Sequence, residues 1–264
     1  MNQVTSRMMN FFCAATMLAV SIGAQAKIVS KEIEYKDGDQ ALKGYLAYDD
    51  AAKGSHPGVL VVHDWMGIGA FSTKKADDLA KLGYVAFAAD IYGVGNLPKD
   101  MKGAGEMATK YKSDRTLLRS RVGATYKVLL AQKGVDSKKI GAIGFCFGGT
   151  TALELGRSGA DVKSIVSFHG GLSNPTPADA KNIKGHVLVL HGANDPWVDE
   201  KEVAAFNQEM RASNVDWQFH SFSGAVHAFT NPEAGNDPSK GAAYNKAASD
   251  RAWVMMKDFF KETL

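Results

Sequence analysis

The sequence predicts an α/β fold built on a doubly wound, mostly parallel sheet with helices on both faces. Continuous apolar runs such as residues 59–62 are typical of strands buried on both faces of a parallel sheet. These runs alternate along the chain with longer segments of helical periodicity. The 264 residues, 45% hydrophobic and 22% charged, suffice for one such domain with a substantial core.

The N-terminal segment has a composition of its own and predicts a secretory signal peptide. Arg7 gives a positive start, residues 8–23 are mostly apolar or small, and Ala24-Gln25-Ala26 is typical of a cleavage site. A membrane anchor and an N-terminal core helix are the alternatives, but the apolar stretch is short for a span and no stop-transfer pattern follows it. The chain therefore divides into a signal peptide, residues 1–26, and a single domain, residues 27–264. We expect this domain to be exported, to the periplasm in a Gram-negative source.

The net charge and the cysteine content exclude several kinds of binding partner and metal site. The formal net charge is +3 and the lysines are scattered, so the chain has no footprint for nucleic acid or an anionic membrane. One of the two cysteines, Cys13, lies in the signal peptide. Its removal leaves Cys146 as the only thiol, which excludes an internal disulfide and a zinc–cysteine cluster. We expect a monomer that acts on a small molecule, without membrane contact after cleavage.

The domain begins with two strands and then alternates strands and helices. Residues 29–35 and 42–48 are predicted to pair as an antiparallel hairpin through a turn at residues 36–39. Further strands are predicted at residues 59–62, 84–88, 139–143, 162–168, 186–190 and 215–219. Helices are predicted at residues 73–82, 101–132, 150–155, 199–213 and 244–260, the second of them broken near its start by Gly103 and Gly105.

The hexapeptide Gly-Phe-Cys-Phe-Gly-Gly at residues 144–149 joins a strand to a helix and predicts a nucleophile elbow at Cys146. Gly144 and Gly148, two positions before and after the cysteine, permit close packing of strand and helix. At a helix N-terminus, the backbone N–H groups favour the reactive thiolate. The alternative is a buried structural cysteine in a glycine-rich turn.

Two further residues lie where a thiol nucleophile needs its partners. Asp195 follows the strand at residues 186–190, and His227 follows the strand at residues 215–219. The order nucleophile, acid, histidine is that of a hydrolase triad, in which the histidine is the base and the acid orients it. Asp195 also precedes Pro196, so the alternative for it is an ordinary turn aspartate.

Two backbone donors are expected to form an oxyanion hole. One is the N–H of Phe147, directly after the nucleophile, and the other is the N–H of Trp65, in the loop after residues 59–62. Other histidines also follow apolar strands. They are interpreted as structural groups around the floor of the site, and the alternative is a metal centre for which no known ligand spacing is present. The candidate ligands of that alternative are His63, Asp64, His169 and His191.

These residues together resemble the dienelactone hydrolase family, a branch of the α/β-hydrolases with a cysteine nucleophile. The resemblance covers nearly the whole of residues 27–264. Its motifs are G-x-C-x-G-G at residues 144–149, H-[DE]-x-x-G at 63–67, D-I-Y-G at 90–93, H-G-x-x-D-P at 191–196 and G-x-x-H-x-F at 224–229. The resemblance implies an α/β-hydrolase fold and a triad of Cys146, Asp195 and His227. It also implies that Asp64 holds the resting thiol, and it adds Tyr92 as a contact of substrate or thiol.

The sequence departs from the family pattern at one position. The best-known members hydrolyse dienelactone and grip its carboxylate with arginines, one of them four residues after the catalytic histidine. Asn231 stands there in this chain, which argues against a tight fit to that anionic lactone. Replacement cations are available at Lys99, Lys102 and Arg115.

The expected activity is hydrolysis of a small ester or lactone through a thioester acyl-enzyme, with no cofactor. Cys146 attacks the carbonyl, and His227 protonates the leaving alkoxide. One rival is an exported, non-catalytic protein that uses the same pocket to hold a small molecule. A second rival, a thiol redox or peroxide-handling protein, lacks a C-x-x-C motif and a resolving cysteine.

Overall fold

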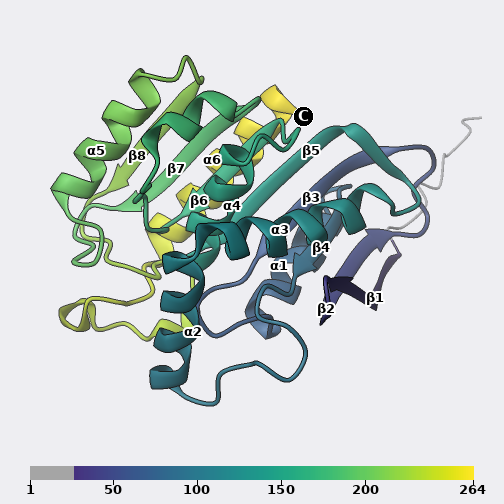
Figure 1. Cartoon of the computed structure of the whole chain (residues 1–264), viewed down its shortest axis with the longest axis horizontal. Coiled ribbons are helices and arrows are strands. Elements are labelled where there is room, and N and C mark those ends of the chain that lie inside the picture. The colour runs from purple at the N-terminus through teal and green to yellow at the C-terminus, as the bar shows by residue number, and fades with distance from the viewer. Residues whose placement is uncertain (1–26) are drawn as a thin grey trace, which may run out of the picture.

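A computed structural model describes residues 27–264, and the predicted signal peptide lies outside the described residues. Eight strands form one sheet in the order β1-β2-β4-β3-β5-β6-β7-β8 (Figure 1). The strands are β1 (Ile28–Asp37), β2 (Gln40–Asp49), β3 (His56–Val62), β4 (Val85–Ala89), β5 (Val135–Phe145), β6 (Ser164–Phe168), β7 (His186–Gly192) and β8 (Trp217–Phe222). The β1–β2 and β2–β4 pairs are antiparallel and the other pairs are parallel, which confirms the predicted mostly parallel sheet with an antiparallel start.

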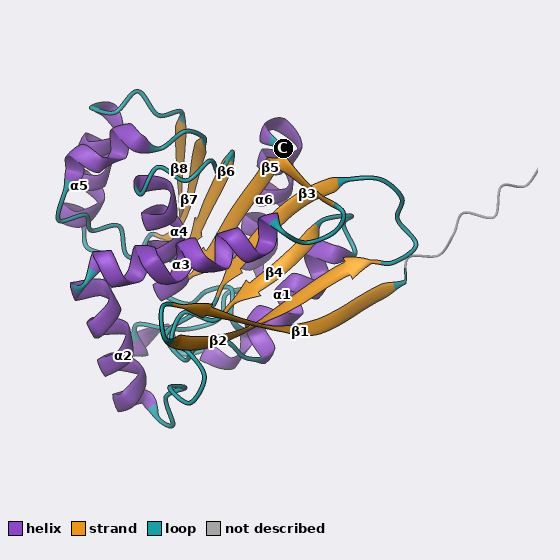
Figure 2. Cartoon of the chain, turned by 45° about the vertical axis from the view of Figure 1, so that its right-hand side comes forward, coloured by secondary structure: helices purple, strands orange, loops and turns teal. Residues whose placement is uncertain are grey.

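Helices cover both faces of the sheet. They are α1 (Ala70–Ala80), α2 (Met101–Ser113), α3 (Arg115–Leu130), α4 (Phe147–Arg157), α5 (Glu200–Arg211) and α6 (Lys246–Thr263), with short 3₁₀ turns η1 (Pro177–Asn182), η2 (Pro232–Ala234) and η3 (Pro238–Lys240). The apolar residues of α1 and α6 pack into one core cluster, and those of α2 to α5 pack into another. Figure 2 shows the β1–β2 hairpin at one edge of the sheet and β8 with α5 near the other.

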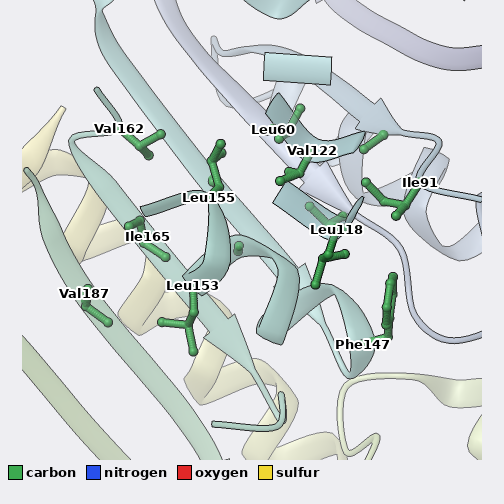
Figure 3. Close-up of a cluster of buried hydrophobic side chains, with 14 of the residues drawn as sticks. Leu60, Ile91, Leu118, Val122, Phe147, Leu153, Leu155, Val162, Ile165 and Val187 are labelled. Carbon is green, nitrogen blue, oxygen red and sulfur yellow. The ribbon is translucent and has the colours of Figure 1, made fainter. Parts of the chain in front are cut away.

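The larger core cluster lies between the sheet and the layer that contains α3 and α4. Leu118 and Val122 of α3 and Leu153 of α4 face Leu60 and Ile165 of the sheet (Figure 3). Every residue of α4 is buried. The helix that follows Cys146 is therefore enclosed along its length, with no exposed residue.

The predicted long helix at residues 101–132 is in fact two helices, and the predicted break was wrong. Gly103 lies in the first turn of α2, where its N–H is donated to the side chain of Asp100. The chain breaks at Asp114 instead, which ends α2 and begins α3 with φ −111° and ψ 86°. The Asp114 carboxylate accepts the N–H of Leu117 at 2.9 Å. A side-chain cap, rather than a flexible glycine, separates the two helices.

Strand pairing extends several of the predicted strands, and β7 and β8 are extended at their C-terminal ends. β7 continues through Gly192 and β8 through Phe222, because His191 pairs with Ser221 at the end of the ladder. His191 therefore lies in a strand, not in the loop after it. The 3₁₀ turns had no counterpart in the sequence prediction. Over residues 27–264, no helix combines the length and apolar character that a membrane span requires.

Candidate active site

Cys146 lies in the sharp turn between β5 and α4, as the sequence predicted. Its φ is 55° and its ψ is −115°, a backbone conformation that costs a non-glycine residue about 1–2 kcal/mol. A Cβ atom on Gly144 would lie 1.9 Å from the carbonyl oxygen of Gly148, and one on Gly148 would lie 2.3 Å from that of Val62. Both glycines are therefore needed for the close approach of strand, helix and neighbouring loop.

Asp195 and His227 form a buried pair beside the elbow. Asp195 Oδ2 lies 2.7 Å from His227 Nδ1, and its Oδ1 accepts the N–H of Trp197 at 2.9 Å. The backbone of His227 is bonded on both sides, to Gly241 O at 3.1 Å and from Ala243 N at 3.1 Å. The imidazole therefore has a defined orientation, with Nδ1 donating to the carboxylate and Nε2 left for another partner.

The pKa of His227 reflects its surroundings. Burial disfavours the charged imidazolium and acts to lower the pKa. The negative charge of the Cys146 thiolate and hydrogen bonds to Asp195 and Cys146 act in the opposite direction and raise the pKa to about 10. Cys146 and Asp195 are thus the two neighbours that favour the protonated ring of His227.

Two backbone N–H groups flank this pair. Trp65 and Phe147 both line the cavity above Cys146. Within residues 27–264, neither of their N–H groups is donated to a protein acceptor. The hydroxyl of Tyr92 donates to the carbonyl of Trp65 at 3.0 Å, and the ring of His63 stacks on Phe147 with centroids 5.7 Å apart. The rings of Tyr92 and His63, which contact each other, therefore support both Trp65 and Phe147.

The cavity in front of Cys146 has a volume of about 690 Å³. Its lining is mainly apolar and includes Trp65, Met66, Phe71, Met101, Ala108, Phe147, Trp197, Val198, Ala228 and Ala242. Lys112 is the only lysine or arginine among its described lining residues, whereas Asp64 and Glu233 contribute two carboxylates. Lys99, Lys102 and Arg115, the predicted replacement cations, do not line it.

One side of the cavity carries the carboxyl groups of Asp64 and Glu233. Burial raises the pKa of Asp64, and the charge of Glu233 adds to that shift, against the opposing influence of Met66, His63 and His227. Asn231 lines the cavity too, and its Oδ1 accepts the N–H of Glu233 at 3.0 Å. This bond directs the Asn231 side chain to the loop backbone at the place where an arginine was expected.

Only some of the remaining predicted residues line the cavity. His63 and His169 line the cavity, whereas His191 does not. Tyr92 is fully buried and supports the Trp65 loop from below without lining the cavity. Among residues 27–264, no group of three or more histidine, cysteine or acidic side chains is placed to hold a metal ion.

Sequence reasoning missed two residues of this region, Glu233 and Thr230. Both follow His227 closely, on the loop that carries it. Proximity to His227 is the one signal that the sequence offers for them, because no motif predicts which of these side chains turns toward the cavity.

Comparison with known proteins shows which family the chain resembles. The chain matches the model of the dienelactone hydrolase family over residues 42–264. The structure named "m3DLH" is 41% identical, with a TM-score of 0.87 over 90% of this chain and 99% of that chain. A dienelactone hydrolase-like promiscuous phosphotriesterase from metagenomic libraries is 39% identical, with a TM-score of 0.86 over 90% and 99%. A Bradyrhizobium protein named "Probable 2-oxo-3-(5-oxofuran-2-ylidene)propanoate lactonase" is 31% identical over 76% of this chain and 81% of its own length.

A family match over most of the chain and close structural likeness at these identities lead to one conclusion. The chain belongs to the dienelactone hydrolase family and is a hydrolase with the α/β-hydrolase fold.

Proposed function

We propose that this protein hydrolyses a small neutral ester or lactone by acyl transfer to Cys146, with His227 as base and Asp195 as the residue that orients it. One observation carries the proposal: the 2.7 Å bond between Asp195 and His227, together with the raised pKa of that histidine beside the Cys146 sulfur. A binding protein on the same fold would not need a buried acid and base beside a thiol in this order.

The steps follow from the geometry. The Cys146 thiolate adds to the carbonyl carbon, and the negative charge that moves to the carbonyl oxygen is stabilised by the N–H groups of Trp65 and Phe147. Collapse of this intermediate expels the alkoxide, which takes the Nε2 proton of His227, and leaves a thioester. Neutral His227 then accepts a proton from water, the hydroxide attacks the thioester, and the acid and the thiolate–imidazolium pair are released.

The substrate class follows from the cavity lining. Asn231 stands at the place of the expected arginine, Asp64 and Glu233 add carboxyl groups rather than cations, and the apolar side chains suit an uncharged acyl or alkyl group. We therefore expect a neutral ester or lactone to be preferred over dienelactone, although the Bradyrhizobium relative is named for an anionic lactone.

A neutral phosphotriester is a second candidate substrate. One relative, 39% identical to this chain, is named a promiscuous phosphotriesterase, and the cavity here offers the same features that favour a neutral ester. Attack of the thiolate on phosphorus would release an alcohol and form a phosphorylated cysteine, which water would then hydrolyse. Turnover of paraoxon beside a carboxylic ester would measure this activity.

The decisive experiment compares wild type with Cys146→Ala and Cys146→Ser, using p-nitrophenyl acetate and dienelactone as substrates. We expect wild-type turnover of the neutral ester, a lower kcat/KM for dienelactone, and no activity in Cys146→Ala. Iodoacetamide should label Cys146 and abolish turnover in parallel, as mass spectrometry of the labelled peptide would show. An inactive wild type whose Cys146 resists alkylation would refute the nucleophile and favour the binding-protein alternative.

We also propose that the chain is exported, from the composition of residues 1–26. N-terminal sequencing of protein recovered from a periplasmic extract checks this, with Lys27 as the expected first residue. An uncleaved N-terminus would contradict it.

A further inference from the structure

His169 connects the nucleophile to the loop that carries the catalytic histidine. The N–H of Cys146 is shared between the carbonyl of Phe168, at 3.0 Å, and Nδ1 of His169, at 3.1 Å. On the other side of the ring, His169 Nε2 lies 2.7 Å from Thr230 Oγ1. Thr230 is three residues after His227, so one imidazole spans the distance between the elbow and the histidine loop.

The hydrogen bonds assign the tautomer of His169. Nδ1 accepts the N–H of Cys146 and therefore carries no proton, so Nε2 carries the proton and donates it to Thr230. His169 and Thr230 are 2% and 3% exposed, so water does not compete for these bonds. Burial, together with the charge of His227, holds the pKa of His169 well below its ordinary value. The ring is thus neutral and keeps this donor and acceptor arrangement.

The backbone of His169 is strained in this arrangement. His169 has a φ of 40°, one of four non-glycine residues with positive φ in the described part of the chain. The backbone N–H of His169 is donated to the carbonyl of Leu190 at 2.8 Å. The ring also contacts His227 edge-on, with centroids 5.3 Å apart. A strained residue whose side chain is bonded at both ends is typical of a functional constraint.

We infer that the Thr230–His169 bridge is a positioning device: it holds the His227 loop at a set distance from Cys146, so that Nε2 of His227 meets the sulfur. The bridge acts through the backbone N–H of Cys146 and the hydroxyl of Thr230, and the ring of His169 also lines the cavity. This inference rests on the proposed function, because it assumes that Cys146 and His227 react as a pair. It assigns a role to two residues outside the triad and the oxyanion hole.

The test compares Thr230→Val, which keeps the shape and removes the hydroxyl, with Thr230→Ser, which keeps the hydroxyl. Loss of one buried hydrogen bond that leaves Nε2–H unpaired should lower kcat of Thr230→Val on p-nitrophenyl acetate about tenfold, with little change in KM. The alkaline limb of its pH profile should move to lower pH, because His227 loses contact with the thiolate. Thr230→Ser should remain within about twofold of wild type.

Thr125→Val is the matched control, because Thr125 is a buried threonine that bonds Tyr35 at 2.8 Å, away from the cavity. It should lose stability and keep the wild-type pH profile. Should Thr230→Val not fold, His169→Asn supplies the same comparison, since its shorter side chain does not reach Thr230. Its pH profile should show the same shift.

The outcomes separate the two proposals. An active wild type in which Thr230→Val and Thr230→Ser share one rate and one pH profile would overturn the bridge and leave the proposed function intact. A wild type that neither hydrolyses the ester nor reacts with iodoacetamide would overturn the proposed function, whatever the variants do.

Discussion

His227 owes its basicity to two neighbours on opposite sides of its ring. Asp195 accepts the Nδ1 proton at 2.7 Å, and the charge of Cys146 acts on the same ring. Each neighbour favours the protonated ring, against the cost of burial. The basicity of His227 therefore depends on two neighbours, and a single substitution can remove either of them.

Asp195→Asn should lower kcat for p-nitrophenyl acetate by roughly 10²- to 10⁴-fold, because the amide does not hold the same tautomer or stabilise the imidazolium. The alkaline limb of the pH profile, expected near the His227 pKa of about 10, should move to lower pH. Asp237→Asn is the control, since Asp237 is an exposed N-cap whose role asparagine can fill. Equal activity of the two variants would remove Asp195 from the mechanism.

We expect the protein to lose stability in mild acid, because three histidines near the site are buried in their neutral form. Burial is the main cause that lowers the pKa of His63, His169 and His191 below the ordinary value of 6.5. The unfolded chain therefore binds protons below about pH 6.5 while the folded chain does not. The stability that these neutral rings contribute is complete above that pH and is lost as pH falls toward their folded pKa values.

Urea unfolding between pH 5 and pH 8 measures this effect. Each histidine that stays neutral in the folded protein should lower the free energy of unfolding by up to about 1.4 kcal/mol per pH unit below pH 6.5. His169→Asn removes one such group, so its slope with pH should be shallower by up to about one proton. An unchanged slope would show that His169 titrates normally in the folded protein.

At the scale of the element, the turn at Cys146 depends on the residues on both sides of it. Phe145 ends β5, Cys146 turns the chain, and the fully buried α4 leads away. The turn needs glycine at two places because backbone atoms, which do not move aside as a flexible side chain does, occupy the space of a Cβ. Stability and the position of Cys146 therefore depend on the same residues.

Gly144→Ala and Gly148→Ala should each destabilise the protein by about 3 kcal/mol or more and abolish ester turnover, because the added carbon overlaps backbone atoms. Thermal unfolding and ester kinetics together test this. Gly123→Ala is the opposite case, since Gly123 lies within α3 with nothing within 4 Å of an added Cβ. It should stabilise the protein by about 0.5–1 kcal/mol. Wild-type stability in Gly144→Ala would contradict the overlap.

At the scale of the whole molecule, a buried ion cluster joins elements from distant parts of the chain. Arg157, at the end of α4, is fully buried and forms a two-pronged pair with Glu209 of α5 at 2.9 and 2.7 Å. It also donates to Glu154 at 3.0 Å and to the carbonyl of Leu172 at 3.2 Å. The cluster ties the elbow helix to α5 and to the loop after β6.

Arg157→Leu should lower the free energy of unfolding by about 3–5 kcal/mol, because it leaves the buried carboxylate of Glu209 without its guanidinium, whereas Glu154 keeps its bond from Arg119. Arg251→Leu, at an exposed position of α6, should change it by no more than about 0.5 kcal/mol. Chemical denaturation of both variants measures the difference. A small effect at Arg157 would mean that water or a nearby cation replaces the guanidinium.

The sequence by itself determined the fold class, the turn at Cys146 and the places of Asp195 and His227 along the chain. These follow from near neighbours: an apolar run predicts a buried strand, and the residues after parallel strands gather at one edge of the sheet. The two glycines of the elbow are predictable for the same local reason. The break at Asp114 is local as well, but its capping signal is weaker than the two glycines that suggested a different place.

Only the tertiary structure decided which distant side chains meet. His169 and Thr230 are 61 residues apart, and Arg157 and Glu209 are 52 apart. The acidic lining at Asp64 and Glu233 likewise brings together two loops from opposite ends of the chain. The physical reason is that such contacts depend on strand order, register and helix packing at once, whereas periodicity and spacing report only on the few residues around each position.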